Sequence, residues 1–163
     1  MLRTIKTAII LMLLISLFAC RKSSTETTID KDDPKEHKTR LIGSWKLSAQ
    51  VTDTPYDFDG DGTNDTDLFA MYSSCGRDQG FVFNADATGS RKFACQPVRL
   101  TTWKIFSHSD SIAFSMSSNN GQTFTDGGKV ELVNVTSSQL VLRYKMKMLQ
   151  SPVLQLTDTY VKQ

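Results

Sequence analysis

The chain has 163 residues, enough for one domain of ordinary size. Its 19 lysines and arginines nearly balance 17 aspartates and glutamates, and 39% of its residues are hydrophobic. A nucleic-acid-binding domain needs a strongly basic face, which this balance does not favour, so we expect no nucleic-acid partner.

The first nineteen residues have the layout of a secretory signal peptide. Arg3 and Lys6 form a short basic region, and residues 8–18 form an apolar run interrupted only by Ser16. This run is too short to cross about 30 Å of hydrocarbon, which takes about 20 helical residues. We therefore expect residues 1–19 to be removed on export. Without Arg3 and Lys6 the 19 basic residues become 17, equal to the 17 acidic ones.

Leu17-Phe18-Ala19-Cys20 resembles the lipobox of bacterial lipoproteins. The resemblance implies cleavage before Cys20, lipidation of its thiol with diacylglycerol, a further acyl chain such as palmitate, and a place in the cell envelope, most often the outer membrane. Several acyl chains hold a protein firmly on a bilayer. The alternative is an uncleaved N-terminal anchor with a chance cysteine.

Residues 21–40 are strongly polar, and Ile29 is their only aliphatic side chain. Such a segment buries too little apolar surface to offset the entropy of ordering. We therefore expect residues 20–40 to be the lipidated cysteine and a disordered tether, with His37 in solvent, and the folded domain to span residues 41–163.

From Leu41 the pattern indicates short strands separated by turns. The clearest alternation points Leu140, Leu142, Tyr144, Met146 and Met148 inward. A helical turn is expected only within 67–74, and Asn119-Asn120-Gly121 favours a tight hairpin. Sequential hairpins predict an all-β fold, either a sandwich or, preferably, an antiparallel up-and-down barrel, because closure removes exposed edges. The expected strands are 41–51, 79–84, 89–95, 98–107, 111–116, 129–135, 139–148 and 153–161.

The cysteine count agrees with export. The chain has three cysteines, and lipidation would use Cys20. Cys75 and Cys95 remain as a pair in an oxidising compartment, so we expect a disulfide between them rather than two free thiols.

Two stretches resemble a known family. Leu41 to Leu47 contains the Gly-x-Trp pattern that opens lipocalin-type barrels. Cys75, residues 81–86, Cys95 and Trp103-Lys104-Ile105 resemble the lipocalin-like domain of lipoproteins from Gram-negative bacteria. The resemblance covers about residues 38–163 and implies a barrel of about eight strands in which Trp45 plugs the closed end. Ala87-Thr88 before Gly89 departs from the family pattern and implies a longer loop.

An Asp-rich loop matches part of a calcium-binding pattern. Asp57, Asp59 and Asp61 stand at loop positions 1, 3 and 5, with Gly62 at 6 and Asp65 at 9. The other expected ligands are the Thr63 backbone carbonyl and the Asp67 carboxylate. Position 12, where such loops place a bidentate Glu, is Leu68. Ca²⁺ is thus a possible ion at residues 57–67, and a solvated acidic turn is the equal alternative. No cofactor is required.

We expect no enzyme. His108-Ser109-Asp110 has the residue types of a catalytic triad, but adjacent side chains of a strand point in opposite directions. No nucleophile elbow, phosphate loop or zinc spacing occurs.

The barrel interior is therefore the main candidate for a functional site. The residues expected to line it are Phe81, Phe83, Phe114, Leu142, Tyr144 and Met146. In small barrels side chains either fill the lumen or leave room for one ligand. We expect a monomeric, membrane-anchored binding or interaction module for a small apolar ligand or an envelope protein. The alternative is an inhibitor of an extracytoplasmic hydrolase or a scaffold of an envelope complex.

Overall fold

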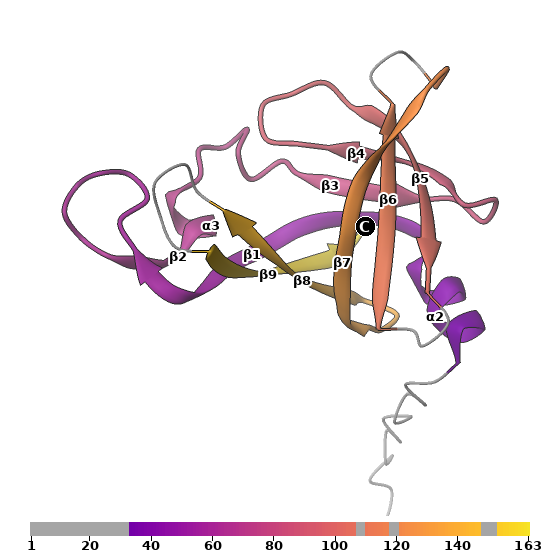
Figure 1. Ribbon diagram of the computed structural model, residues 1–163, viewed down its shortest axis with the longest axis horizontal. Helices are drawn as coiled ribbons and strands as arrows, with labels where there is room; N and C mark the ends of the chain where they lie inside the picture. Colours follow the sequence, from indigo (N-terminus) through magenta and orange to yellow (C-terminus); the bar gives the residue numbers. More distant parts are fainter. Residues whose placement is uncertain (1–32, 107–109, 118–120, 148–152) are drawn as a thin grey trace, which may run out of the picture.

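Figure 1 shows the fold in a computed structural model that describes residues 33–106, 110–117, 121–147 and 153–163. The described residues form two short helices and nine antiparallel strands. In chain order they are α2 (Pro34–Leu41), β1 (Gly43–Tyr56), β2 (Asp65–Asp67), α3 (Leu68–Met71), β3 (Gly80–Phe83), β4 (Thr88–Lys92), β5 (Arg99–Ile105), β6 (Ser111–Ser117), β7 (Phe124–Val135), β8 (Gln139–Lys147) and β9 (Val153–Lys162).

The sheet closes on itself. Strands β3 to β8 each pair with the next strand along the chain, β3 pairs with the start of β1, and the last strand, β9, pairs with β1 from Trp45 to Thr52. Strand β2 is an addition that pairs with the second half of β1. The ring of β1 and β3–β9 is therefore an up-and-down barrel, which confirms the predicted fold class and excludes the sandwich.

Alternation decides which side chains face inward. Along β9, Leu154, Leu156, Asp158 and Tyr160 are buried, and the residues between them are more exposed. Along β8, Leu140 and Leu142 are buried, and Lys145 and Lys147 are exposed. Met148, predicted to point inward, lies outside the described residues. The main hydrophobic cluster runs from Leu41 to Tyr160 in the sequence, so residues 33–163 hold a complete core.

The strands extend beyond their predicted ranges in two places. Strand β1 continues to Tyr56, and its last residues are mostly exposed, so they lack the alternation that marks a half-buried strand. Strand β7 begins at Phe124 rather than 129. Two glycines interrupt its pattern, and Gly128 has a φ of +91° beside a shift in the β6–β7 register. The helical turn expected within 67–74 is α3. Of the predicted turn at 119–121, only Gly121 is described, with a φ of +90°.

The prediction of a disordered tether is wrong for residues 34–40. Helix α2 begins there, with the Asp33 carboxylate accepting a hydrogen bond from the Lys35 backbone N–H at 2.8 Å. His37, expected in solvent, is buried, and Leu41 at the end of the helix is fully buried. The helix is stable because it packs on one end of the barrel, a tertiary contact that its polar sequence does not reveal.

The signal peptide, the lipobox with Cys20 and the rest of the predicted tether lie outside the described residues. None of the helices within the described ranges has the length and apolar character needed to cross a bilayer.

Candidate functional site: the barrel interior

The barrel interior has two chemically different halves. The half next to α2 is aromatic. Phe81 lies at its centre, with ring centroids 5.3 Å from Phe83, 5.0 Å from Phe114 and 5.3 Å from Tyr160. Phe83 in turn meets Trp103 edge to face at 5.4 Å. Three of the predicted lumen residues therefore pack on one another and fill this half with side chains.

Trp45 belongs to the same half. It lies at the start of β1, directly after α2, and its side chain is 2% exposed. The indole Nε1 donates a hydrogen bond to the Leu41 backbone carbonyl at 2.7 Å, which ties the end of the helix to the first strand. The Lys162 ammonium lies 5.0 Å from the centre of the ring. Trp45 is therefore buried beneath the helix, at the α2 end of the interior.

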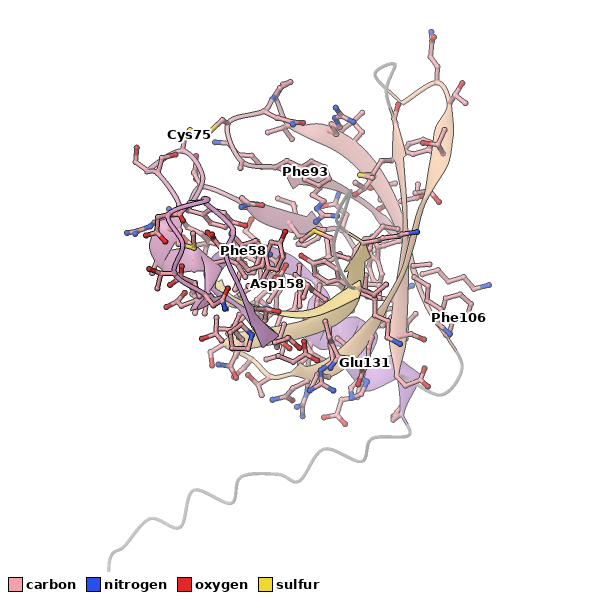
Figure 2. All side chains as sticks on the ribbon, turned by 60° about the vertical axis from the view of Figure 1, so that its left-hand side comes forward. Phe58, Cys75, Phe93, Phe106, Glu131 and Asp158 are labelled. Carbon is pink, nitrogen blue, oxygen red and sulfur yellow. A yellow bond between two sulfur atoms is a disulfide. The ribbon has the colours of Figure 1, made fainter. Side chains whose placement is uncertain are left out.

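The other half of the interior contains a buried polar cluster centred on Asp158. The Asp158 carboxylate accepts hydrogen bonds from Gln50 Nε2 at 2.6 Å, from the Tyr160 hydroxyl at 2.9 Å and from the Tyr144 hydroxyl at 3.3 Å. The Tyr72 hydroxyl donates to the Gln50 side-chain carbonyl. Asp158 is 2% exposed, and Figure 2 shows it among the side chains at the centre of the molecule. Three strands thus meet at one carboxylate, and the segment after α3 joins the cluster through Gln50.

The register explains why these side chains meet. Asp158 of β9 lies opposite Gln50 of β1 on one side and opposite Leu142 of β8 on the other. Directly opposite residues of an antiparallel pair point to the same face of the sheet, so Gln50 and Asp158 both point inward. Tyr144 is two residues from Leu142 on the same strand and shares its face.

Burial sets the protonation of the cluster. It raises the pKa of the Asp158 carboxyl above its usual value, against the lowering effect of the hydrogen bonds from Gln50, Tyr160 and Tyr144. Burial also raises the pKa values of Tyr72, Tyr144 and Tyr160, and the nearby Asp158 charge raises them further. The three phenols therefore keep their protons at neutral pH and act as hydrogen-bond donors.

Arg91 faces the same half of the interior. It lies opposite Phe81 in the β3–β4 pair, and its guanidinium carbon is 4.8 Å from the centre of the Phe81 ring and 4.1 Å from that of Phe93. Its positive charge lowers the pKa values of Tyr144 and Asp158, although less than burial raises them. No carboxylate of the described residues lies within ion-pair distance of Arg91, so it is a cation held between two aromatic rings.

The interior is less completely buried at this end. At the α2 end the inward side chains of β8, Leu140 and Leu142, are buried, whereas Tyr144 and Met146 farther along the strand are half-buried. Met116 of β6 and Arg91 of β4 are half-buried as well. We call this partly accessible end of the interior the mouth of the barrel. Of the predicted lumen residues, Tyr144 and Met146 line this mouth.

A disulfide holds the loops beside the mouth. Cys75, before β3, is bonded to Cys95, after β4, with 5.0 Å between their Cα atoms. The predicted pairing is confirmed. Because Phe93 lies two residues before Cys95, the bond restrains the segment that carries this ring against Arg91.

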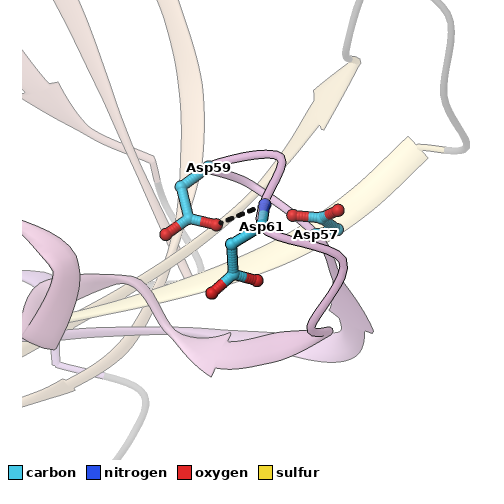
Figure 3. Close-up of side chains that lie close together, drawn as sticks. All are labelled: Asp57, Asp59 and Asp61. Atoms are coloured by element: carbon cyan, nitrogen blue, oxygen red, sulfur yellow. Dashed lines mark hydrogen bonds between the residues drawn. The ribbon is translucent and has the colours of Figure 1, made fainter.

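The Asp-rich loop lies at the far end of β1 from α2. Figure 3 shows Asp57, Asp59 and Asp61 close together, and a carboxylate oxygen from each lies within 4.8 Å of the others. The same carboxylates accept backbone hydrogen bonds, among them Gly60 N–H to Asp57 at 2.7 Å and Thr63 N–H to Asp61 at 2.7 Å. Three of the predicted calcium ligands are thus gathered.

The other carboxylates of the predicted set are placed differently. Asp65 lies in β2 opposite Tyr56, and the Asp67 carboxylate caps α3 by accepting from Ala70 N–H at 3.0 Å. Neither belongs to the group of three. His108 and Ser109, named above for their triad residue types, lie outside the described residues.

Sequence reasoning missed Asp158, Gln50, Arg91 and Tyr160. One signal was available. In β9, Leu154, Leu156, Asp158 and Tyr160 share one face of a period-2 pattern, so a carboxylate stands among residues predicted to point inward. The partners of Asp158 come from β1 and β8, and no local pattern predicts that pairing.

Comparison with known proteins gives limited information. The profile of a family described as a domain of unknown function, DUF5004, matches residues 22–99. No curated protein matches significantly. Among solved structures, the chain is similar to the bovine lipocalin allergen Bos d 2, with 11% sequence identity and a TM-score of 0.41, covering 77% of this chain and 75% of that one.

Proposed function

We propose that this chain is a non-enzymatic binding protein of the cell envelope that takes a small, mainly apolar ligand into the mouth of the barrel. The observation that carries the proposal is the cluster of Asp158, Gln50 and Tyr144 inside a lumen whose wall is only half-buried at that end. Ligand pockets commonly combine apolar walls with a few fixed polar groups.

The chemistry of the mouth limits what the ligand offers. Met116, Met146 and Phe93 supply adaptable apolar contact. Arg91, without a carboxylate partner among the described residues, would meet a hydrogen-bond acceptor on the ligand. The ligand class is therefore an apolar molecule with an acceptor oxygen near one end.

Anchoring completes the proposal. The lipobox resemblance of residues 17–20 supports export and lipidation of Cys20, and several acyl chains would keep the barrel at a membrane.

The binding test uses a neutral apolar fluorophore with a carbonyl oxygen near one end, 6-propionyl-2-(dimethylamino)naphthalene, and a chain of residues 21–163, which contains the complete core. We expect its fluorescence to rise on addition of the protein. Met146→Trp would fill the mouth and abolish the rise. The matched control is Lys145→Trp on the neighbouring, outward-facing position, which should bind the fluorophore as the wild type does. Equal binding by both variants would place the ligand elsewhere.

A further inference from the structure

The second feature of interest is a groove at the α2 end of the barrel. It has a volume of about 340 Å³ and lies between the helix, the β3–β4 turn and the end of β5. Its floor is apolar, formed by Ala87, Trp103 and Ile105, and the side chains of Lys35, Lys38 and Lys104 line it. It is separate from the mouth, which lies at the opposite end of the lumen.

None of the three lysines forms an ion pair with a carboxylate in the described part of the chain. Lys38 lies 5.9 Å from the centre of the Trp103 ring, and Lys104 lies 5.8 Å from that of Phe106. Lys129 lies 4.4 Å from the same Phe106 ring and adds a fourth positive charge beside the groove.

The carboxylates of the neighbouring segments do not line the groove. Asp33 caps α2, and Glu36 pairs with Arg40. Asp86 accepts from the Thr88 hydroxyl at 2.6 Å, and Asp110 accepts from the Ser111 hydroxyl at 2.7 Å. Among the described residues, the lining of the groove thus carries three positive charges and no carboxylate, so it suits an anionic partner.

The two ends of the barrel differ in charge. The loop that follows β1 carries Asp57, Asp59 and Asp61, and Figure 1 shows it at the opposite end of that strand from α2. An anionic surface would attract the α2 end and repel the loop end, so charge alone would orient the molecule.

The chain also enters the described fold at this end. Twelve residues, 21–32, lie between Cys20 and Asp33. A chain of that length spans at most about 45 Å. A lipid on Cys20 would keep the α2 end within that distance of the bilayer, whatever the conformation of the connecting segment.

We propose that the α2 end of the barrel docks on the anionic phospholipid surface of a membrane, with lipid phosphates at Lys35, Lys38 and Lys104 and the apolar part of a headgroup region over Trp103 and Ile105. The mouth then faces away from the bilayer. The choice of a membrane as the anionic partner rests on the proposed lipidation of Cys20. The lysine groove itself is a feature of the described fold and does not depend on Cys20.

The test is sedimentation of a chain of residues 21–163 with vesicles of pure phosphatidylcholine and with vesicles that also contain phosphatidylglycerol. We expect binding to the anionic vesicles alone, weakened by salt. Each lysine near an anionic surface contributes about fivefold in affinity, so Lys38→Gln with Lys104→Gln should weaken binding roughly 25-fold.

The matched control is Lys145→Gln with Lys147→Gln, which removes the same charge from exposed positions on β8. It should bind within about twofold of the wild type, since these lysines lie away from the groove. Equal losses in the two variants, or equal binding to neutral and anionic vesicles, would overturn the proposal. Because the chain tested lacks Cys20, and fluorophore binding is measured separately, neither outcome depends on the anchor or on the ligand in the mouth.

Discussion

At the scale of single residues, Asp158 is the most informative side chain. It is a buried carboxylate that accepts hydrogen bonds from Gln50, Tyr144 and Tyr160, and burial keeps its pKa above the ordinary value. Removing a charge from water is costly unless the group is well paired, so such a residue is more readily explained by a site than by the stability of the fold.

The raised pKa predicts a pH dependence with a definite sign. The folded protein binds the Asp158 proton more tightly than the unfolded chain does, so this residue contributes stability at low pH that is lost as pH rises through its folded-state pKa. The Asp158→Asn variant has no titratable group at this position, so it serves as the reference. We therefore expect the free energy of unfolding of the wild type, relative to the variant, to increase between about pH 7 and about pH 4. Urea unfolding of both proteins at each pH measures it, and a difference that stays constant or decreases would refute the assignment.

At the scale of elements, the strands and their sequential pairing could be predicted, and the register of the pair that closes the barrel could not. Seven of the predicted strand ranges overlap β3–β9 because inward and outward residues alternate and turn residues separate them. Helix α2 and strand β2 were missed. The first is polar and depends on packing against the barrel, and the second has only three residues, Asp65–Asp67. The closing pair of β1 and β9 joins residues more than a hundred positions apart, which no local pattern specifies.

The Asp-rich loop belongs to the same scale, and calcium binding there stays a prediction. Three carboxylates within 4.8 Å of one another repel, and a divalent cation would relieve that repulsion. With a Kd of about 0.1 mM, about 1 mM Ca²⁺ would add about 1.4 kcal/mol and raise the Tm by a few degrees.

Thermal unfolding in Ca²⁺ and in chelator tests this prediction. Asp59→Asn with Asp61→Asn should remove the difference in Tm, whereas Asp65→Asn, outside the group of three, should weaken it less. Identical Tm values for the wild type in both buffers would make the loop a solvated acidic turn.

At the scale of the whole molecule, the barrel has a filled end and an open end. The aromatic cluster and α2 close one, while Arg91, Tyr144 and Met146 line the other. The acidic loop lies at the open end, and the lysine groove at the closed end. An anchored barrel with this polarity would present its mouth to the compartment and its helix to the lipid.

Anchoring itself predicts a simple fractionation result. Cys20→Ala removes the thiol that lipidation needs, so the variant should leave the membrane fraction or persist as the unprocessed precursor. The wild type should sediment with membranes and lose residues 1–19. Processing and membrane association that survive the substitution would contradict the lipoprotein interpretation.

The binding claim is tested most directly by protection of the mouth from a thiol reagent. Met146→Cys and Lys145→Cys place a thiol on the inner and outer faces of neighbouring positions of β8, in a chain of residues 21–163 whose own two cysteines are joined in the disulfide. Saturating 6-propionyl-2-(dimethylamino)naphthalene should slow maleimide labelling at position 146 and leave the labelling rate at position 145 unchanged. If the fluorophore changed the labelling rate at neither position, or slowed it equally at both, a ligand site inside the barrel would be contradicted.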